Sequence, residues 1–430
     1  MAIITPFQAW RYNPAQVALN NVVTQPYDKI TSEMQDHYYQ AEAHNLVRII
    51  LGRHYSADSE NNNVYARAAA SFREWRQSGI LRQDSTPSFY SYSQTFAIPG
   101  TSTSAERRGL IALGRLEDYS AGIVFRHELT HSGPKVDRLN LLRATRAHFG
   151  QIFMLYDGNG ETDRLLQSPA APDIEVTDEY GVIHRVWRIA EPSIISQAAS
   201  QFSGKKLIIA DGHHRYETAL NYRNERRASS PGELNPAYDW VMMTLVDMSN
   251  PGLVILPTHR VVHSLASFSE DNLLTGARRF FTVEEIPRLN AAKPASVLQD
   301  RGRAGTALLA VTTERTFLMH SPKALGTNVF AGLSPRQQSL DVVQLHKCIL
   351  EGVLNISEEA IRNLQNVAYC RETSEALAQV QSGKAQAAFL MNPVRIDQMR
   401  RVAFAGEVMP QKSTDFYPKM LSGLTIYGLE

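Results

Sequence analysis

The stretch from Leu207 to Leu220 constrains the fold of this chain more than any other, because it joins a strand to a helix through a sharp turn. Residues 207–210 form an apolar run typical of a short buried strand, and Asp211-Gly212 predicts a turn directly after it. From His213 onward, apolar residues at helical spacing predict a helix with one buried face. That face would consist of Tyr216, Ala219, Leu220 and Tyr222.

The same turn has the composition of an anion site. A helix that starts at a glycine turn has unpaired backbone N–H groups at the positive end of its dipole. His213, His214 and Arg215 fall in that first turn, and an arginine can bind two phosphate oxygens through its fork of donors. A purely structural interpretation takes the histidines as core or capping residues and Asp211-Gly212 as an ordinary turn. Three donor side chains in succession favour the anion site.

Composition indicates a globular protein of two or three domains. The 430 residues include 44 Lys and Arg against 43 Asp and Glu, which gives a net charge of +1. This balance provides no general attraction to nucleic acid or to acidic lipid. Cys348 and Cys370 form neither a disulfide framework nor a zinc cluster by themselves. No signal peptide or membrane-spanning segment is recognised, so we expect a cytoplasmic protein with no membrane partner.

A second group of polar residues lies at 127–138. His127 to His131 is formally an H-E-x-x-H sequence, which in zinc hydrolases requires both histidines one turn apart on a helix. A β-like run precedes it and Pro134 follows soon after, so a loop is the better interpretation. A loop would deliver mixed charges suited to phosphate or magnesium, although a surface salt-bridge cluster fits equally well. The residues concerned are His127, Glu128, Lys135, Asp137 and Arg138.

Two further segments contain candidate site residues. Pro26 ends a short strand expected at Val22–Thr24, which places Tyr27 and Asp28 on a loop, where Asp28 is either a base or a helix N-cap. Near the C-terminus, the segment 405–419 includes Lys412-Ser413-Thr414 and has no useful periodicity. It is expected either to close over a ligand or to cap the core.

The pattern of elements predicts a mixed α/β protein with two folded domains. Residues 1–265 would form the catalytic domain, and 396–430 a tail that returns to the active site. Between them, residues 266–395 read as β-α-β-β-α-β-α-β, which suits a ferredoxin-like or related α/β sandwich.

Taken together, these residues resemble a prokaryotic family known only as a domain of unknown function. The matching pieces are Pro26-Tyr27-Asp28, His127-Glu128 with Pro134-Lys135 and Asp137-Arg138, Ala210–Ala219, Met409-Pro410, Lys412-Ser413-Thr414 and Phe416–Lys419. The turn at Gly212–Arg215 is also similar to the phosphate-binding turn of the ParB and sulfiredoxin superfamily, which includes kinases of free serine. That resemblance implies a ParB/sulfiredoxin-like catalytic core. Because His213 stands where sulfiredoxin needs a cysteine, sulfinic-acid repair is not expected.

The resulting hypothesis is a small-molecule kinase that transfers a phosphoryl group from pyrophosphate, ATP or ADP to a free hydroxyl, with L-serine as the acceptor. Asp28 or Asp211 would be the base, and Asp211 would help to hold Mg²⁺. His213 and His214 would stabilise the transferred group, while Tyr27, His127 and Glu128 would contact the substrate. The donor phosphates would be bound by Gly212, His213, His214, Arg215, Lys135, Arg138, Lys412, Ser413 and Thr414.

Three alternatives remain open from the sequence. A nucleotide-dependent DNA-binding regulator of ParB type would need a basic recognition face, which the charge balance does not favour. A zinc-dependent hydrolase would use His127 and His131, and a phosphatase would use the same anion site. The sequence leaves a homodimer open and does not fix the oligomeric state.

Overall fold

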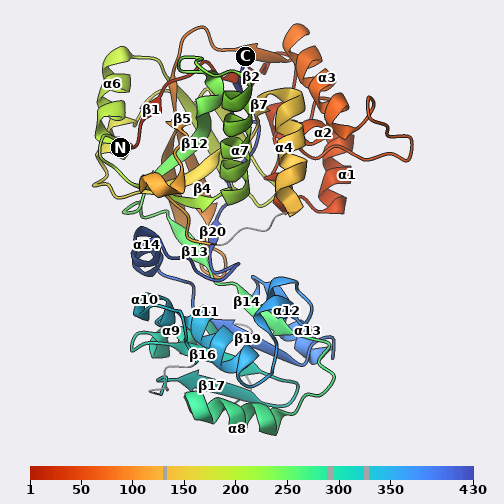
Figure 1. Ribbon diagram of the computed structural model, residues 1–430, viewed down its shortest axis with the longest axis vertical. Coiled ribbons are helices and arrows are strands. Elements are labelled where there is room, and N and C mark those ends of the chain that lie inside the picture. Colours follow the sequence, from red (N-terminus) through yellow and green to blue (C-terminus); the bar gives the residue numbers. More distant parts are fainter. Residues whose placement is uncertain (129–132, 288–293, 324–328) are drawn as a thin grey trace. The chain divides into compact units, whose positions relative to one another are not determined.

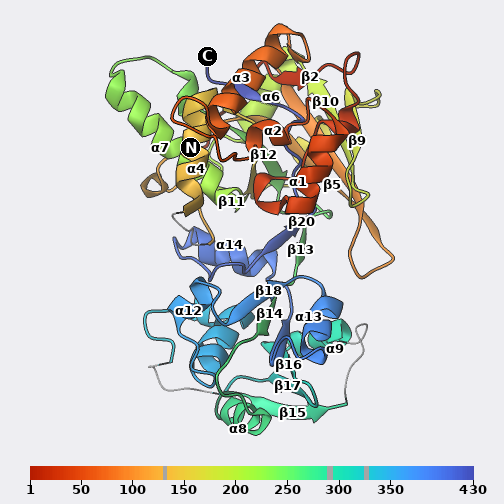
Figure 2. The ribbon, with the colours of Figure 1, turned by 90° about the vertical axis from the view of Figure 1, so that its right-hand side faces the viewer.

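The computed structural model describes residues 1–128, 133–287, 294–323 and 329–430, and the chain forms two compact units (Figures 1 and 2). The first unit contains Met1–Arg126, Thr130–Val254 and Pro418–Glu430, so both ends of the chain belong to it. The second unit contains His127–Leu129 and Ile255–Tyr417. Together they make a mixed α/β protein, as the sequence predicts. Within the described residues, no helix is both long and apolar enough to cross a membrane.

The first unit is built on a nine-stranded mixed sheet. Its strands are β1 (Ile4–Thr5), β4 (Phe89–Ala97), β5 (Ser104–Arg115), β6 (Val124–Phe125), β8 (Ile152–Tyr156), β9 (Ile174–Thr177), β10 (Ile183–Ile189), β11 (Leu207–Asp211) and β12 (Trp240–Asp247). The order is β6-β11-β8-β12-β5-β4-β10-β9, with β1 paired to β5. The pairs β11–β6 and β12–β8 are parallel and the others are antiparallel. Two small ribbons join β2 (Trp10–Tyr12) to β3 (Leu81–Gln83) and β7 (Ala147–His148) to β21 (Tyr427–Gly428).

The helices of the first unit pack around this sheet. They are α1 (Ser32–Ala41), α2 (Val47–Ile50), α3 (Val64–Gln77), α4 (Gly133–Thr145), α5 (Glu161–Leu165), α6 (Pro192–Gln201) and α7 (His213–Ser229), with short 3₁₀ turns at η1 (Leu19–Asn21), η2 (Tyr27–Lys29), η3 (Tyr119–Ala121) and η4 (Ala237–Asp239). Helices α4 and α7 lie side by side, as Figure 1 shows. Tyr216, Ala219 and Leu220 of α7 pack into the main core of the sheet, as their spacing predicts.

The second unit has a six-stranded antiparallel sheet in the order β15-β17-β16-β19-β14-β18. The strands of this sheet are β14 (His259–Val262), β15 (Thr282–Ile286), β16 (Ala307–Val311), β17 (Thr316–His320), β18 (Val367–Cys370) and β19 (Ala387–Met391). A separate two-stranded sheet pairs β13 (Val254–Leu256) with β20 (Asp415–Tyr417). The helices of the second unit are α8 (Glu270–Phe280), α9 (Pro294–Gly302), α10 (Pro335–Gln338), α11 (Asp341–Gln344), the π-helix η5 (Leu345–Glu351), α12 (Glu358–Arg362), α13 (Thr373–Gln381) and α14 (Ile396–Phe404).

The domain limits in the structure differ from those expected. The units divide at 254/255 instead of 265/266, because β14 is paired on both sides inside the second sheet. The expected tail 396–430 is also divided, since α14 and β20 belong to the second unit and Pro418–Glu430 to the first.

Three local predictions are wrong. The apolar run at 44–51 predicts a strand, but the side chain of Asn45 accepts from the Val47 N–H (2.9 Å) and α2 follows. A buried apolar run of this length does not distinguish a strand from a helix. The charged residues at 224–233 predict a turn, but α7 continues to Ser229. At Val22–Thr24 the structure has an isolated bridge between Thr24 and Ser422 instead of a strand.

Candidate functional site

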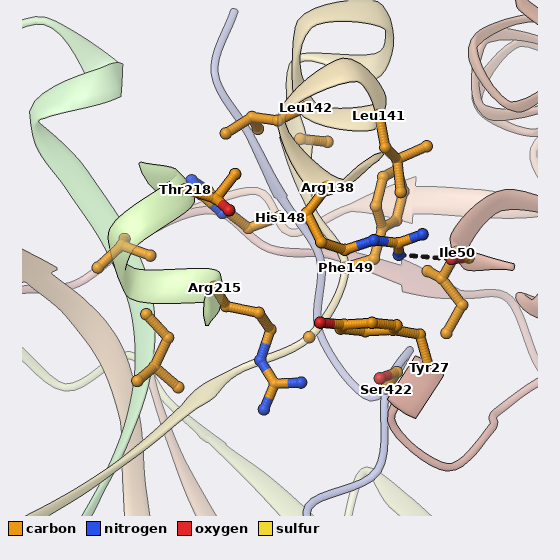
Figure 3. A pocket seen from close by; sticks show the side chains of 14 residues that line it. Tyr27, Ile50, Arg138, Leu141, Leu142, His148, Phe149, Arg215, Thr218 and Ser422 are labelled. Atoms are coloured by element: carbon orange, nitrogen blue, oxygen red, sulfur yellow. Dashed lines mark hydrogen bonds between the residues drawn. The ribbon is translucent and has the colours of Figure 1, made fainter. Parts of the chain in front are cut away.

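The turn between β11 and α7 has the conformation that the sequence predicts. Gly212 has φ +92°, in the left-handed region that favours glycine, and it is the N-cap of α7. A Cβ at this position would lie 2.9 Å from both Nε and Nη2 of Arg215. Glycine is therefore required for two reasons: the backbone must turn, and the guanidinium of Arg215 must fold back toward the strand (Figure 3).

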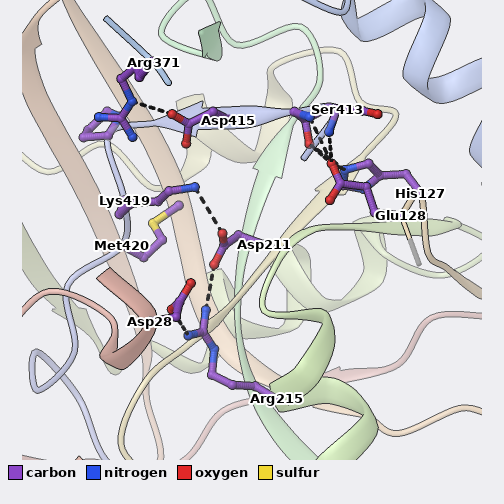
Figure 4. A network of polar contacts seen from close by, with 12 residues as sticks. Asp28, His127, Glu128, Asp211, Arg215, Arg371, Ser413, Asp415, Lys419 and Met420 are labelled. Atoms are coloured by element: carbon purple, nitrogen blue, oxygen red, sulfur yellow. Dashed lines mark hydrogen bonds and ion pairs between the residues drawn. The ribbon is translucent and has the colours of Figure 1, made fainter. Parts of the chain in front are cut away.

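Asp211, the last residue of β11, lies between two cations (Figure 4). Arg215 Nη2 is 2.8 Å from Oδ2 of Asp211, and Lys419 Nζ is 3.2 Å from Oδ1. Burial alone would raise the pKa of the Asp211 carboxyl, but Lys419, Arg215 and Lys29 outweigh burial and hold that pKa below its ordinary value. Asp211 is therefore a permanent carboxylate that orients two cations.

Arg215 also faces a second carboxylate. Its Nη1 is 3.9 Å from Oδ1 of Asp28, whose side chain is 41% exposed. Burial lowers the pKa of Arg215, but Asp211 and Asp28 raise it further, so the guanidinium stays charged. Asp28 lies in η2, which begins directly after Pro26. The structure thus brings together Asp28, Asp211, Gly212 and Arg215 from the predicted set.

His213 and His214 are the first two residues of α7 and are half-buried. Among the described residues, no side chain caps this end of the helix, because the N-cap is a glycine. A helix of 17 residues that begins in this way presents its positive end beside Arg215.

Tyr27 and Arg138 form a stacked pair in the same unit. The guanidinium carbon of Arg138 lies 4.2 Å from the centre of the Tyr27 ring. Arg138 also donates from Nη1 to the backbone carbonyl of Ile50 (2.6 Å) and pairs with Asp137. These contacts already engage Arg138, so its geometry suits the support of Tyr27 better than the binding of phosphate. The side chain of Lys135 lies outside the described residues.

Sequence reasoning missed the role of Lys419. Two side chains hold the backbone around Lys419 in place. They are Gln94 of β4 and Arg107 of β5, which are cross-strand partners. Gln94 Nε2 donates to the carbonyl of Lys419 (2.8 Å), and Arg107 donates to the carbonyl of Pro418 and to Oε1 of Gln94. Arg107 is 1% exposed, and burial lowers its pKa to about 10. The only signal in the sequence is that Lys419 belongs to the resembling segment 416–419; its separation from Asp211 by 208 positions gives none.

The remaining predicted residues form a separate network in the second unit (Figure 4). Oε1 of Glu128 accepts from the backbone N–H of Ser413 (3.0 Å), the N–H of Thr414 (2.9 Å) and the Thr414 hydroxyl (3.0 Å). Nε2 of the buried His127 is 2.7 Å from that hydroxyl oxygen. The donors expected to bind phosphate therefore hold a carboxylate. Lys412, beside them, is exposed.

His127 and Glu128 are not helical, in agreement with the loop interpretation. Backbone contacts tie them to the segment before β20, since the Met409 N–H donates to the His127 carbonyl (2.8 Å). His131, the other histidine of the zinc alternative, lies outside the described residues.

Residues 4–343 match the family model described as a protein of unknown function, DUF1015. The chain belongs to the DUF1015 family. Among solved structures, this DUF1015 member is similar to a conserved hypothetical protein from Pyrococcus furiosus (12% identity, 69% of this chain and 88% of that chain, TM-score 0.35). It is also similar to a free serine kinase in complex with AMP (11%, 68% and 83%, TM-score 0.35) and to C-terminally truncated SbnI from Staphylococcus aureus (10%, 73% and 85%, TM-score 0.31).

No curated protein matches the sequence. At these TM-scores the structural similarities carry no functional argument.

Proposed function

We propose that this protein is a small-molecule kinase that binds donor phosphates at the start of α7. The observation that supports the proposal is the pairing of one carboxylate, Asp211, with two cations, Arg215 and Lys419, at an N-terminal helix end. Phosphoryl transfer needs precise positioning and neutralisation of charge more than covalent chemistry. A pair of cations held by one carboxylate beside a helix dipole supplies both.

The roles of the two aspartates follow from their surroundings. Asp211 has a lowered pKa and accepts from Arg215 and Lys419, so it is a poor proton acceptor and acts by orienting these cations. Asp28 is more exposed and faces Arg215 from outside the turn. We therefore assign the general base for the acceptor hydroxyl to Asp28. His213 and His214 would stabilise the transferred group.

Magnesium does not fit Asp211 as this side chain is arranged. Both of its carboxylate oxygens already contact a cationic nitrogen. In the described part of the chain, no three His, Cys, Asp or Glu side chains gather as a metal site. A Mg²⁺ ion carried by the donor phosphates is compatible with this site, and no step of the proposed reaction depends on it.

The proposed reaction moves a phosphoryl group from pyrophosphate or a nucleotide to a free hydroxyl, with L-serine as the first acceptor to test. The acceptor oxygen attacks the terminal phosphorus, its proton passes to Asp28, and the bond from phosphorus to the bridging oxygen of the donor breaks. Arg215 and Lys419 would hold the charge that the leaving phosphate gains.

The test is phosphoryl transfer from ATP, ADP and pyrophosphate to a panel of hydroxylated metabolites that includes L-serine. Arg215→Lys keeps the charge but loses the fork, and should lower the rate at least about tenfold. The matched control is Arg227→Lys, on the same helix, where Arg227 pairs with Asp239 away from the turn. Equal activity of both variants would refute the proposal, as would a wild-type protein that transfers no phosphate to any acceptor.

A further inference from the structure

A hollow of about 590 Å³, part of it open solvent, lies in the first unit next to Arg215 (Figure 3). Its walls are mainly apolar and aromatic, and they come from α2, α4, α7, β7, β8, β12 and the loops between them. The side chains that matter most are Tyr27, Leu142, Ala147, His148, Phe149 and Thr218.

The hollow contains an unsatisfied polar group. Thr218 is 4% exposed, and among the described residues its hydroxyl has no hydrogen-bond partner. Nε of Arg215, one turn earlier on α7, also has none within the described chain. A buried hydroxyl without a hydrogen-bond partner is unfavourable, so a bound molecule that supplies a partner would gain affinity.

The lining disfavours an anion inside the hollow. Burial lowers the pKa of His148 to about 4, so this side chain is uncharged at neutral pH. The charge of Arg138 is already balanced by Asp137, and Arg138 stacks on Tyr27. Arg215 borders both the hollow and the site proposed for phosphate. A ligand that occupies both the hollow and the proposed phosphate site would have an uncharged, flat part joined to phosphates.

We propose that the hollow binds the base of a nucleoside phosphate whose phosphates lie at Gly212–Arg215, which makes the donor a nucleotide rather than pyrophosphate. Tyr27, His148 and Phe149 offer ring surfaces for a planar group, and the Thr218 hydroxyl offers one hydrogen bond to its edge. Pyrophosphate would leave this apolar volume empty. The inference rests on the proposed kinase function, because it takes the phosphate site as given.

The test compares the binding of ADP, GDP, CDP, UDP and pyrophosphate to the full chain by calorimetry. Thr218→Val removes the hydroxyl, and Ala147→Leu fills the hollow. The matched control is Thr244→Val, because Thr244 is also fully buried without a hydrogen-bond partner in the described chain but does not line the hollow. We expect at least one diphosphate to bind more tightly than pyrophosphate. Thr218→Val should weaken that diphosphate about tenfold and leave pyrophosphate and the control unchanged.

The outcomes separate this inference from the proposed function. If pyrophosphate binds but no nucleoside diphosphate binds more tightly, the base site is refuted and the phosphate site stands. Equal weakening of nucleotide and pyrophosphate in Thr218→Val would also refute it. If Ala147→Leu changes the KM of the acceptor and not that of the donor, the hollow holds the acceptor instead. If neither ligand binds the wild-type protein, the phosphate site itself fails.

Discussion

Replacement of Gly212 by alanine tests the central geometry most directly. At φ +92° an L-residue is strained by about 1–2 kcal/mol relative to glycine. The new Cβ would also lie 2.9 Å from two atoms of the Arg215 guanidinium. Since that group is the end of a flexible side chain, it should move away rather than unfold the turn. Its movement would break the contact with Asp211, so the loss should appear in anion binding more than in stability.

The matched control for this substitution is Gly204→Ala. Gly204 has φ +86°, but a Cβ added there would have no described atom within 4 Å, so only the backbone cost applies. Urea unfolding should show a loss of about 1–2 kcal/mol in both variants. Calorimetry with pyrophosphate should show at least about tenfold weaker binding for Gly212→Ala and wild-type binding for Gly204→Ala. Equal pyrophosphate affinity in the two variants would refute the argument that Gly212 positions Arg215.

Three further predictions concern charge and burial. Because the pKa of Asp211 is lowered in the folded protein, its carboxylate stabilises the fold above the ordinary aspartate pKa, and this stabilisation is lost as pH falls through the lowered value. The difference in free energy of unfolding between wild type and Asp211→Asn, measured with urea, should therefore shrink between pH 5 and about pH 2. A difference that stays constant over this range would contradict the argument. Burial lowers the pKa of His259 to about 4. Protonation of this histidine in the unfolded state should therefore remove up to about 3 kcal/mol of stability as pH falls from about 6.5 to about 4. In His259→Asn, the free energy of unfolding measured from denaturation curves should depend less on pH over this range. Arg107→Met should loosen the backbone that presents Lys419 and lower transfer activity about tenfold, whereas Arg223→Met, which removes another buried arginine bonded to a backbone carbonyl, should reduce stability alone.

The sequence predicted the elements whose residues carry their own local signal. The strand at 207–211, the glycine turn and the start of α7 follow from a run of apolar residues, one Asp-Gly pair and helical spacing. In each case the decisive interactions lie between neighbours in the sequence.

The parts that sequence reasoning missed depend on distant partners. Nothing near Lys419 indicates that its amine reaches Asp211, and nothing near Ser413 indicates that its N–H binds Glu128. By residue type, Arg138 and Thr414 are candidate phosphate ligands. In the folded chain their donors contact a carbonyl, carboxylates and a tyrosine ring.

The last segment of the chain supplies side chains that contact carboxylates far away in the sequence. Lys419 completes an ion pair with a residue encoded 208 codons earlier, and Thr414 donates in the same long-range way to the carboxylate of Glu128. A premature stop codon just before these two positions would leave nearly all of the polypeptide intact and still remove both partners. Nonsense alleles close to the 3′ end of the reading frame should therefore behave as loss-of-function alleles.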